Sequence, residues 1–225
     1  GKISDSDKKI LRDVIKSLQS ADAFKKNWAL LAKSGKVFTV ISNEQQDKKM
    51  EQTVYDPVQK KTVIIPKLQG GFTPSKDGSG GTIKFHTSVL RNRKQAVPAV
   101  AEEFFHAGQY SLEVKNETDA IEFAVSGKLD KEFEAKVLTD LALLQSSEID
   151  NLPNYPRFSD NYLFAETVFK NLSEKDTPNA DYRMKFDSWS MMGYNGIDPG
   201  SFGAKTGKAP NLLNKLLNKN IKAQK

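Results

Sequence analysis

The sequence predicts an α+β fold in which a small, mostly antiparallel sheet packs on helices and the C-terminal half is helical. Apolar residues recur at helical spacing at the start, and short β-branched runs follow between Val37 and His86. After about Ala96 the helical spacing returns. The length of 225 residues suffices for one compact core. We expect a single domain over residues 1–200, followed by a basic tail or docking helix over residues 201–225.

Two helices are expected in the first part of the chain. The apolar positions that predict the first are Ile10, Leu11, Val14, Ile15 and Leu18. Asp5 or Ser6 is suited to cap this helix, because a short oxygen-bearing side chain can accept a hydrogen bond from the first turn. The second helix is expected from Ala21 to about Ala32, before Gly35.

The strands of the sheet are predicted from β-branched and aromatic runs. Three such runs are residues 37–41, 52–55 and 62–65. Turns are expected at Asn43 and at Asp56–Pro57, because these residue types favour turns. The Gly-rich stretch 70–81 is predicted to be a connector loop that leads into a further short strand at residues 82–86.

Several classes of site are excluded by composition and by missing motifs. The chain has no cysteine, so it contains no disulfide, no thiolate metal site and no cysteine nucleophile. It has two histidines, His86 and His106, too few for a three-histidine metal site. Stretch 70–81 lacks the spacing of phosphate-binding glycine loops, and no serine-hydrolase G-x-S-x-G motif occurs.

The basic excess of the chain lies in its C-terminal segment. Residues 201–225 contain six lysines and no acidic residue, which accounts for the whole formal charge of +6. The rest is balanced, so we expect no nucleic-acid partner. Leucines at 212, 213, 216 and 217, with Ile221, fall at helical spacing opposite lysines. This segment is expected to dock on the protein's own core, or to make weak contact with a membrane surface or partner.

The beginning of the chain shows neither an initiator methionine nor a hydrophobic signal region, so we expect a mature or trimmed chain with Gly1 as a cleavage remnant. No apolar run approaches the roughly 20 residues of a membrane-spanning helix. A soluble, secreted or periplasmic protein is the corresponding expectation, since a chain without cysteine is compatible with export.

The helix expected after Pro98 carries the most informative motif. Residues 102–106 read Glu-Glu-Phe-Phe-His. This segment resembles the H-E-x-x-H helix of the zincin metallopeptidases, in a gluzincin-like form. In that motif two histidines on one side of a helix bind zinc, and the intervening Glu acts as general base. The resemblance implies that His106 is the second histidine ligand and Glu103 the catalytic Glu, whereas Glu102 replaces the first histidine.

The flanking sequence extends this resemblance over residues 80–145. A short, glycine-preceded edge strand often comes before the metal helix in such domains, and residues 80–85 stand at that place. The third ligand is often the Glu of an E-x-x-A pattern on a buried helix. Glu132 fits that pattern and is preferred over Glu134 as the implied ligand. Lys136 departs from it, because an Asp or Asn usually follows the Ala.

The altered motif changes the chemistry expected of the site. Glu102 and His106 remain one helical turn apart, so both can face one point, and a carboxylate can bind zinc. With Glu132 as the third ligand, the two carboxylates lower the net charge of a Zn²⁺ site to about zero, which weakens the metal as a Lewis acid. Carboxylate-rich sites also favour harder ions such as Mn²⁺ or Ca²⁺. The cofactor is therefore zinc, another divalent metal or none.

Alternatives to a metal site formed by Glu102, His106 and Glu132 stay open. Glu102 and His106 can form an ordinary ion pair on a helix surface, with no metal. His86, at the end of the last predicted strand, is either a replacement ligand or a hydrogen-bonded surface residue. Zincins often stabilise the oxyanion with a downstream Tyr, His or Arg, but no pattern selects among candidates such as Tyr182, Arg183 and Tyr194.

The resemblance implies a degenerate zincin-like protein of bacterial origin. Its metallopeptidase activity is expected to be impaired, and the domain is expected to act as a binding or structural module of an exported protein, with a protein partner. The alternative is an active metal-dependent peptidase. In that case Glu102, His106 and Glu132 bind the metal, Glu103 is the base, and the substrate is a protein or peptide.

Overall fold

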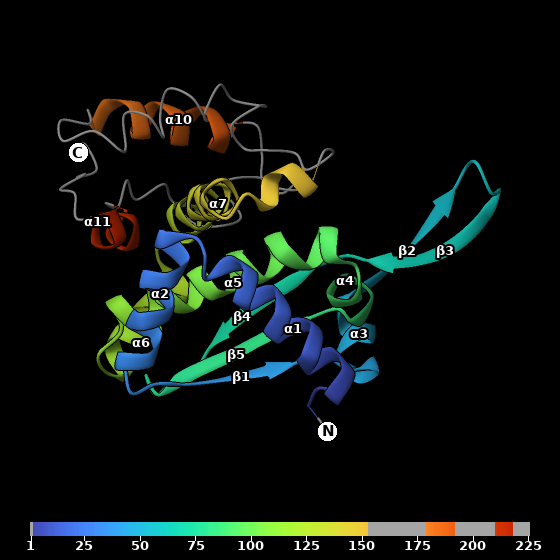
Figure 1. Ribbon diagram of the computed structural model, residues 1–225, viewed down its shortest axis with the longest axis horizontal. Helices are drawn as coiled ribbons and strands as arrows, with labels where there is room; N and C mark the ends of the chain where they lie inside the picture. Colours follow the sequence, from blue (N-terminus) through green and yellow to red (C-terminus); the bar gives the residue numbers. More distant parts are fainter. Residues whose placement is uncertain (1, 153–178, 192–209, 218–225) are drawn as a thin grey trace.

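The structure is a computed structural model that describes residues 2–152, 179–191 and 210–217. Figure 1 shows a small sheet covered by helices, with a two-stranded hairpin projecting from one end. The predicted α+β class is therefore confirmed. The sequence-based predictions on Gly1, Tyr194 and Ile221, and the domain boundary at residue 200, lie outside the described residues.

The first two helices follow the prediction closely. Helix α1 spans Asp5–Leu18 and α2 spans Asp22–Lys33. The N-cap of α1 is Ser4, whose hydroxyl accepts a hydrogen bond from the backbone N–H of Asp7. The predicted caps, Asp5 and Ser6, are wrong by one or two positions, because both already belong to the first turn of the helix.

The three-stranded sheet has the order β1-β5-β4. Strand β1 (Val37–Ile41) is parallel to β5 (Gly80–Phe85), and β4 (Gly70–Pro74) is antiparallel to it. Two predictions are wrong here. The stretch predicted as a loop contains β4, and β5, predicted to be the edge strand, is central. Strand β4 was missed because glycines have low strand propensity. Gly70 is nonetheless needed there, because a Cβ atom at this position would lie 2.8 Å from Cγ of Glu103 in the neighbouring helix.

The hairpin consists of β2 (Glu51–Asp56) and β3 (Lys61–Pro66), which pair antiparallel in agreement with the predicted runs. It forms a sheet of its own and projects from the body in Figure 1. Helix α3 (Glu44–Met50) precedes it and was not predicted. Asn43, predicted as a turn residue, is the N-cap of α3 and accepts a hydrogen bond from the backbone of Gln46.

Beyond about Ala96 the described elements are all helices, as predicted, whereas the short helix over Thr87–Arg91 was not predicted. The helices from Thr87 onward are α4 (Thr87–Arg91), α5 (Arg93–Glu113), α6 (Glu117–Val125), α7 (Lys128–Gln145), η1 (Glu148–Asn151), α10 (Asn179–Met191) and α11 (Asn211–Leu217). Helix α5 begins before Pro98, not after it, because Asn92 caps its N-terminus. The proline lies inside the helix, beyond its first turn, so the helical series of backbone hydrogen bonds lacks one N–H donor there.

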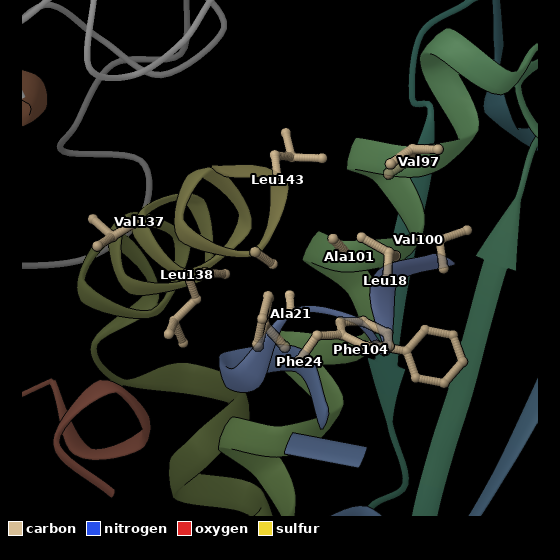
Figure 2. Close-up of a cluster of buried hydrophobic side chains, with 14 of the residues drawn as sticks. Leu18, Ala21, Phe24, Val97, Val100, Ala101, Phe104, Val137, Leu138 and Leu143 are labelled. Carbon is tan, nitrogen blue, oxygen red and sulfur yellow. The ribbon is translucent and has the colours of Figure 1, made fainter. Parts of the chain in front are cut away.

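Helix α5 is the centre of the structure. It contacts strands β4 and β5 and also helices α1, α2 and α7. Its Val97, Val100, Ala101 and Phe104 pack in one cluster with Phe24 of α2 and side chains of α7 (Figure 2). Because α5 and α7 lie side by side, the segments that carry the motif and the downstream glutamates are neighbours in space.

Helix α11 docks on this core through Leu212, Leu213 and Leu216, which are buried in the same cluster. It contacts α2, α5 and α7. Among the described helices, none combines the length and the apolar character that a bilayer crossing requires. The expectation of export stays a prediction.

The close approach of α2 to α5 leads to a first testable expectation. A Cβ atom on Gly108 of α5 would lie 1.9 Å from Oδ1 of Asn27, whose Nδ2 donates to the Phe104 carbonyl at 2.8 Å. We expect Gly108→Ala to lower the free energy of unfolding by about 1–3 kcal/mol, since the core must shift. Urea melts measure the change, and Gly71→Ala, which meets no atom within 4 Å, is the control. Equal stabilities of the two variants would contradict the close packing.

Candidate metal centre

Four charged side chains meet where α5 and α7 lie side by side. Glu102 and His106 are one turn apart on α5, and Glu132 and Lys136 are one turn apart on α7. Glu102, His106 and Glu132 each offer one ligand atom, and these atoms lie within 4.8 Å of one another. Within the part of the chain that the structure describes, no other group of three potential metal ligands is found. The predicted convergence of these three side chains is present.

The charged groups pair across the two helices. Nζ of Lys136 lies 2.6 Å from both carboxylate oxygens of Glu102. Nε2 of His106 lies 3.6 Å from Oε2 of Glu132. The side chains of Glu102 and Lys136 are 16% and 22% exposed, so water screens this pair only partly. Two negative charges thus face two positive ones.

The orientation of His106 is set by Gln109, which lies three residues further along the same face of α5. Nδ1 of His106 lies 2.9 Å from Oε1 of Gln109 and donates its proton to it. Nε2 of Gln109 donates in turn to Oε2 of Glu134 at 2.7 Å and to the Lys131 carbonyl at 2.9 Å. Histidine ligands are typically held in this way, with the second nitrogen turned towards the metal. No role was predicted for Gln109, although its spacing of three residues from His106 was a usable signal.

Glu134 has a supporting position and not a ligand position. Its side chain is buried, and its Oε1 accepts a hydrogen bond from the backbone N–H of Leu213 in α11 at 2.8 Å. Burial raises the pKa of Glu134 to about 7, although the hydrogen bonds from Leu213 and Gln109 act in the opposite direction. Of the two glutamates that the sequence left open, Glu132 is therefore the one beside His106.

Glu103 lies next to this cluster, between α5 and strand β4. It is buried, and a Cβ atom added to Gly70 would lie 2.8 Å from its Cγ. Among the described residues its Oε2 has no hydrogen-bond partner. Burial raises the pKa of Glu103 to about 8; the charge of His106 opposes this rise, and the carboxylates of Glu102 and Glu132 add to it. Glu103 is therefore mostly protonated at neutral pH in this charge environment.

For the imidazole of His106, burial acts on the pKa in the opposite direction from its effect on Glu103. Burial alone would lower its pKa, but the carboxylates of Glu132, Glu103 and Glu102 together outweigh burial, and the pKa rises to about 10. Without a metal ion His106 is thus a cation at neutral pH. A metal ligand must be neutral imidazole, so metal binding has to displace this proton.

The donor set fits a divalent cation, but the neighbouring Lys136 disfavours metal binding. One imidazole nitrogen and two carboxylates suit zinc or manganese, at metal–ligand distances of about 2.0–2.2 Å. The spread of 4.8 Å between ligand atoms means that the side chains must close slightly around an ion. Gln109 favours such a site, because it leaves Nε2 of His106 directed at Glu132. Lys136 opposes it, because its ammonium already neutralises Glu102.

His86 lies outside the group of potential ligands. It is the N-cap of α4, and its Nδ1 accepts a hydrogen bond from the backbone of Ser88 at 3.2 Å. Its Nε2 lies 3.4 Å from Oε1 of Glu51. The side chain is buried, so the expectation of a surface residue is wrong, because the start of the hairpin covers it.

The two described candidates for oxyanion stabilisation have other contacts. Tyr182 is buried with its ring centroid 5.0 Å from that of Phe133. Arg183 pairs with Asp187 one turn away, at 3.1 Å between Nη2 and Oδ1. Neither residue therefore gains support as a catalytic group.

Comparisons of this chain with protein-family models, with curated proteins and with solved structures each found no match.

Proposed function

We propose that this chain is a zincin-like domain with an altered metal centre, which binds a divalent cation weakly and serves mainly to bind a protein or peptide. The observation that carries this proposal is the convergence of Glu102, His106 and Glu132 from two separate helices. The spacing of the first two on α5 is that of a metal-binding pair, and Gln109 orients the imidazole as an outer hydrogen-bond partner does.

Three features favour binding over efficient hydrolysis. Two carboxylate ligands reduce the net positive charge of a bound ion, so it polarises water less. Lys136 competes for one of these carboxylates. Glu103, the implied general base, holds a proton at neutral pH because it is buried, and a protonated carboxyl cannot accept another proton.

An open strand edge beside Glu103 supports a peptide as the partner. Strand β4 pairs with β5 on one side, and no described strand pairs with its other side. The backbones of Gln69 and Ser75 bond towards β5, so the alternation along the strand turns the backbone groups of Gly70 and Phe72 to the open edge. An extended peptide can add to such an edge as a further strand. Glu103 touches β4 at Gly70, so this peptide would pass close to the metal centre.

The second candidate function is metal-dependent peptide hydrolysis, and the position of Glu103 favours it. Its carboxyl is buried beside the cluster with Oε2 unpartnered among the described residues. A cation bound to Glu102 and Glu132 would neutralise the two carboxylates that raise the pKa of Glu103. Glu103 would then lose its proton more easily and could act as a general base.

Metal titration tests the proposal. Protein purified without a metal-affinity column and stripped with a chelator should bind one Zn²⁺ or Mn²⁺ in calorimetry, with a dissociation constant weaker than about micromolar. Glu132→Gln should abolish this binding, because it removes an anionic ligand, whereas Glu122→Gln on α6 should leave it unchanged. If the unmodified chain takes up no divalent ion at millimolar concentration, the proposed metal centre is wrong.

A peptide-hydrolysis assay separates the two candidate functions. With saturating Zn²⁺ or Mn²⁺, the binding module should leave a mixed peptide library intact. Cleavage that disappears in Glu103→Gln, while metal binding persists, would instead establish the peptidase.

A further inference from the structure

Lys136 holds the position nearest to Glu102 at the centre of the cluster. Its Nζ is 2.6 Å from both Glu102 carboxylate oxygens, the close two-point contact of a strong ion pair. Lys136 and Glu132 are one turn apart on α7, so the same helix supplies an anionic candidate ligand and a cation. Both members of the pair are largely withdrawn from water.

We propose that Lys136 is a built-in cation that competes with the metal ion for Glu102 and thereby sets the affinity of the centre. This inference rests on the proposed metal site and names what regulates it. For Glu102 to bind a metal ion, the contact with the Lys136 ammonium must first be broken or weakened. The ammonium also stays within a few ångströms of the bound ion, and in a partly buried site this like-charge repulsion is weakly screened.

The charge balance of the cluster agrees with this role. Lys136 neutralises Glu102, and His106 faces Glu132, so the site is electrically satisfied without any ion. A carboxylate pair without such a cation would attract a divalent ion strongly, since buried negative charge is costly when unpaired. The lysine removes much of that attraction, because a metal ion can bind Glu102 only in competition with the ammonium group that is already paired with it.

Removing the charge of Lys136 tests the proposal directly. Calorimetric titration with Mn²⁺ and Zn²⁺ should show that Lys136→Met binds at least about tenfold more tightly than the unmodified chain. Lys136→Arg keeps the charge and should stay within about threefold of the unmodified chain. The matched control is Lys128→Met, which removes one charge from the exposed start of the same helix and should leave the affinity unchanged.

The outcomes of this titration are distinguishable. If the unmodified chain binds the ion and Lys136→Met binds it no more tightly, the role of Lys136 is refuted while the metal centre stands. If only Lys136→Met binds the ion, the lysine closes the site entirely, which supports the competition and contradicts the proposed function. If neither binds, both proposals fail.

A measurement on the unmodified chain keeps the test valid should Lys136→Met fail to fold. In protein labelled with ¹⁵N-lysine, saturating Zn²⁺ should shift the side-chain amine signal of Lys136 towards that of a solvated lysine, because Glu102 leaves it for the ion. A signal that does not move while the ion binds would overturn the proposal. Lys136→Gln, a shorter neutral replacement that can still donate a hydrogen bond, is the second variant.

Discussion

Glu102→His is expected to turn the weak centre into a zinc site of micromolar or tighter affinity. The variant places two histidines one turn apart on α5, opposite Glu132 at the neighbouring turn of α7. Two neutral imidazoles and one carboxylate are a donor set that zinc prefers. The change also removes the carboxylate that Lys136 neutralises, so the lysine no longer pairs with a metal ligand. The gain over the unmodified chain should be about a hundredfold or more.

Calorimetry with Zn²⁺ measures this gain, and Co²⁺ absorption spectra report whether the ion is four-coordinate. The matched control is Glu117→His at the start of α6, which introduces the same residue on an exposed helix surface. It should bind no more zinc than the unmodified chain. Absence of zinc uptake by Glu102→His, in a protein with an unchanged circular dichroism spectrum, would count against the zincin resemblance as a whole.

The free energy of unfolding of the metal-free protein should fall by several kcal/mol as the pH rises from 5 to 9. The pKa of Glu103 is raised from 4.5 to about 8 and that of Glu134 from 4.5 to about 7. From pH 4.5 up to these raised values, the folded chain therefore holds protons that the unfolded chain has released. The pKa of His106 is raised from 6.5 to about 10. Its stabilising contribution is therefore complete below pH 6.5 and is lost as the pH rises through 10. All three groups give the same sign.

Urea melts at pH 5, 7 and 9 in the presence of a chelator measure this slope. Glu134→Gln keeps one of the two hydrogen-bond acceptors and cannot ionise, so it should flatten the fall between pH 5 and 7. Glu122→Gln should retain it. A stability that is constant or increases over this range would show that the buried carboxyls ionise freely in the folded protein.

Most of the described helices, and four of the five described strands, were predictable because their signals are local. Periodic apolar residues and β-branched runs fix an element whatever its neighbours are. Strand β4 was missed because its glycines carry no strand signal, and their reason, the approach of Gly70 to Glu103, exists only in the folded chain. The central place of β5 is likewise a property of the sheet and not of its own residues.

The candidate site was predictable to the extent that it follows from helical spacing. Glu102 and His106 share a face by their positions alone, and the resemblance supplied Glu132. The supporting roles of Gln109 and Glu134 depend on how α5 packs against α7 and α11. The contact between Lys136 and Glu102 depends on that packing too, and a sequence cannot set the relative rotation of two helices to within the width of a side chain.

Helix α11 supplies no candidate ligand, yet a continuous series of hydrogen bonds joins it to the imidazole. The Leu213 backbone holds Glu134, Glu134 holds Gln109, and Gln109 holds His106. A change in how α11 docks on the core would therefore alter the orientation of the imidazole without replacing any residue of the candidate metal centre.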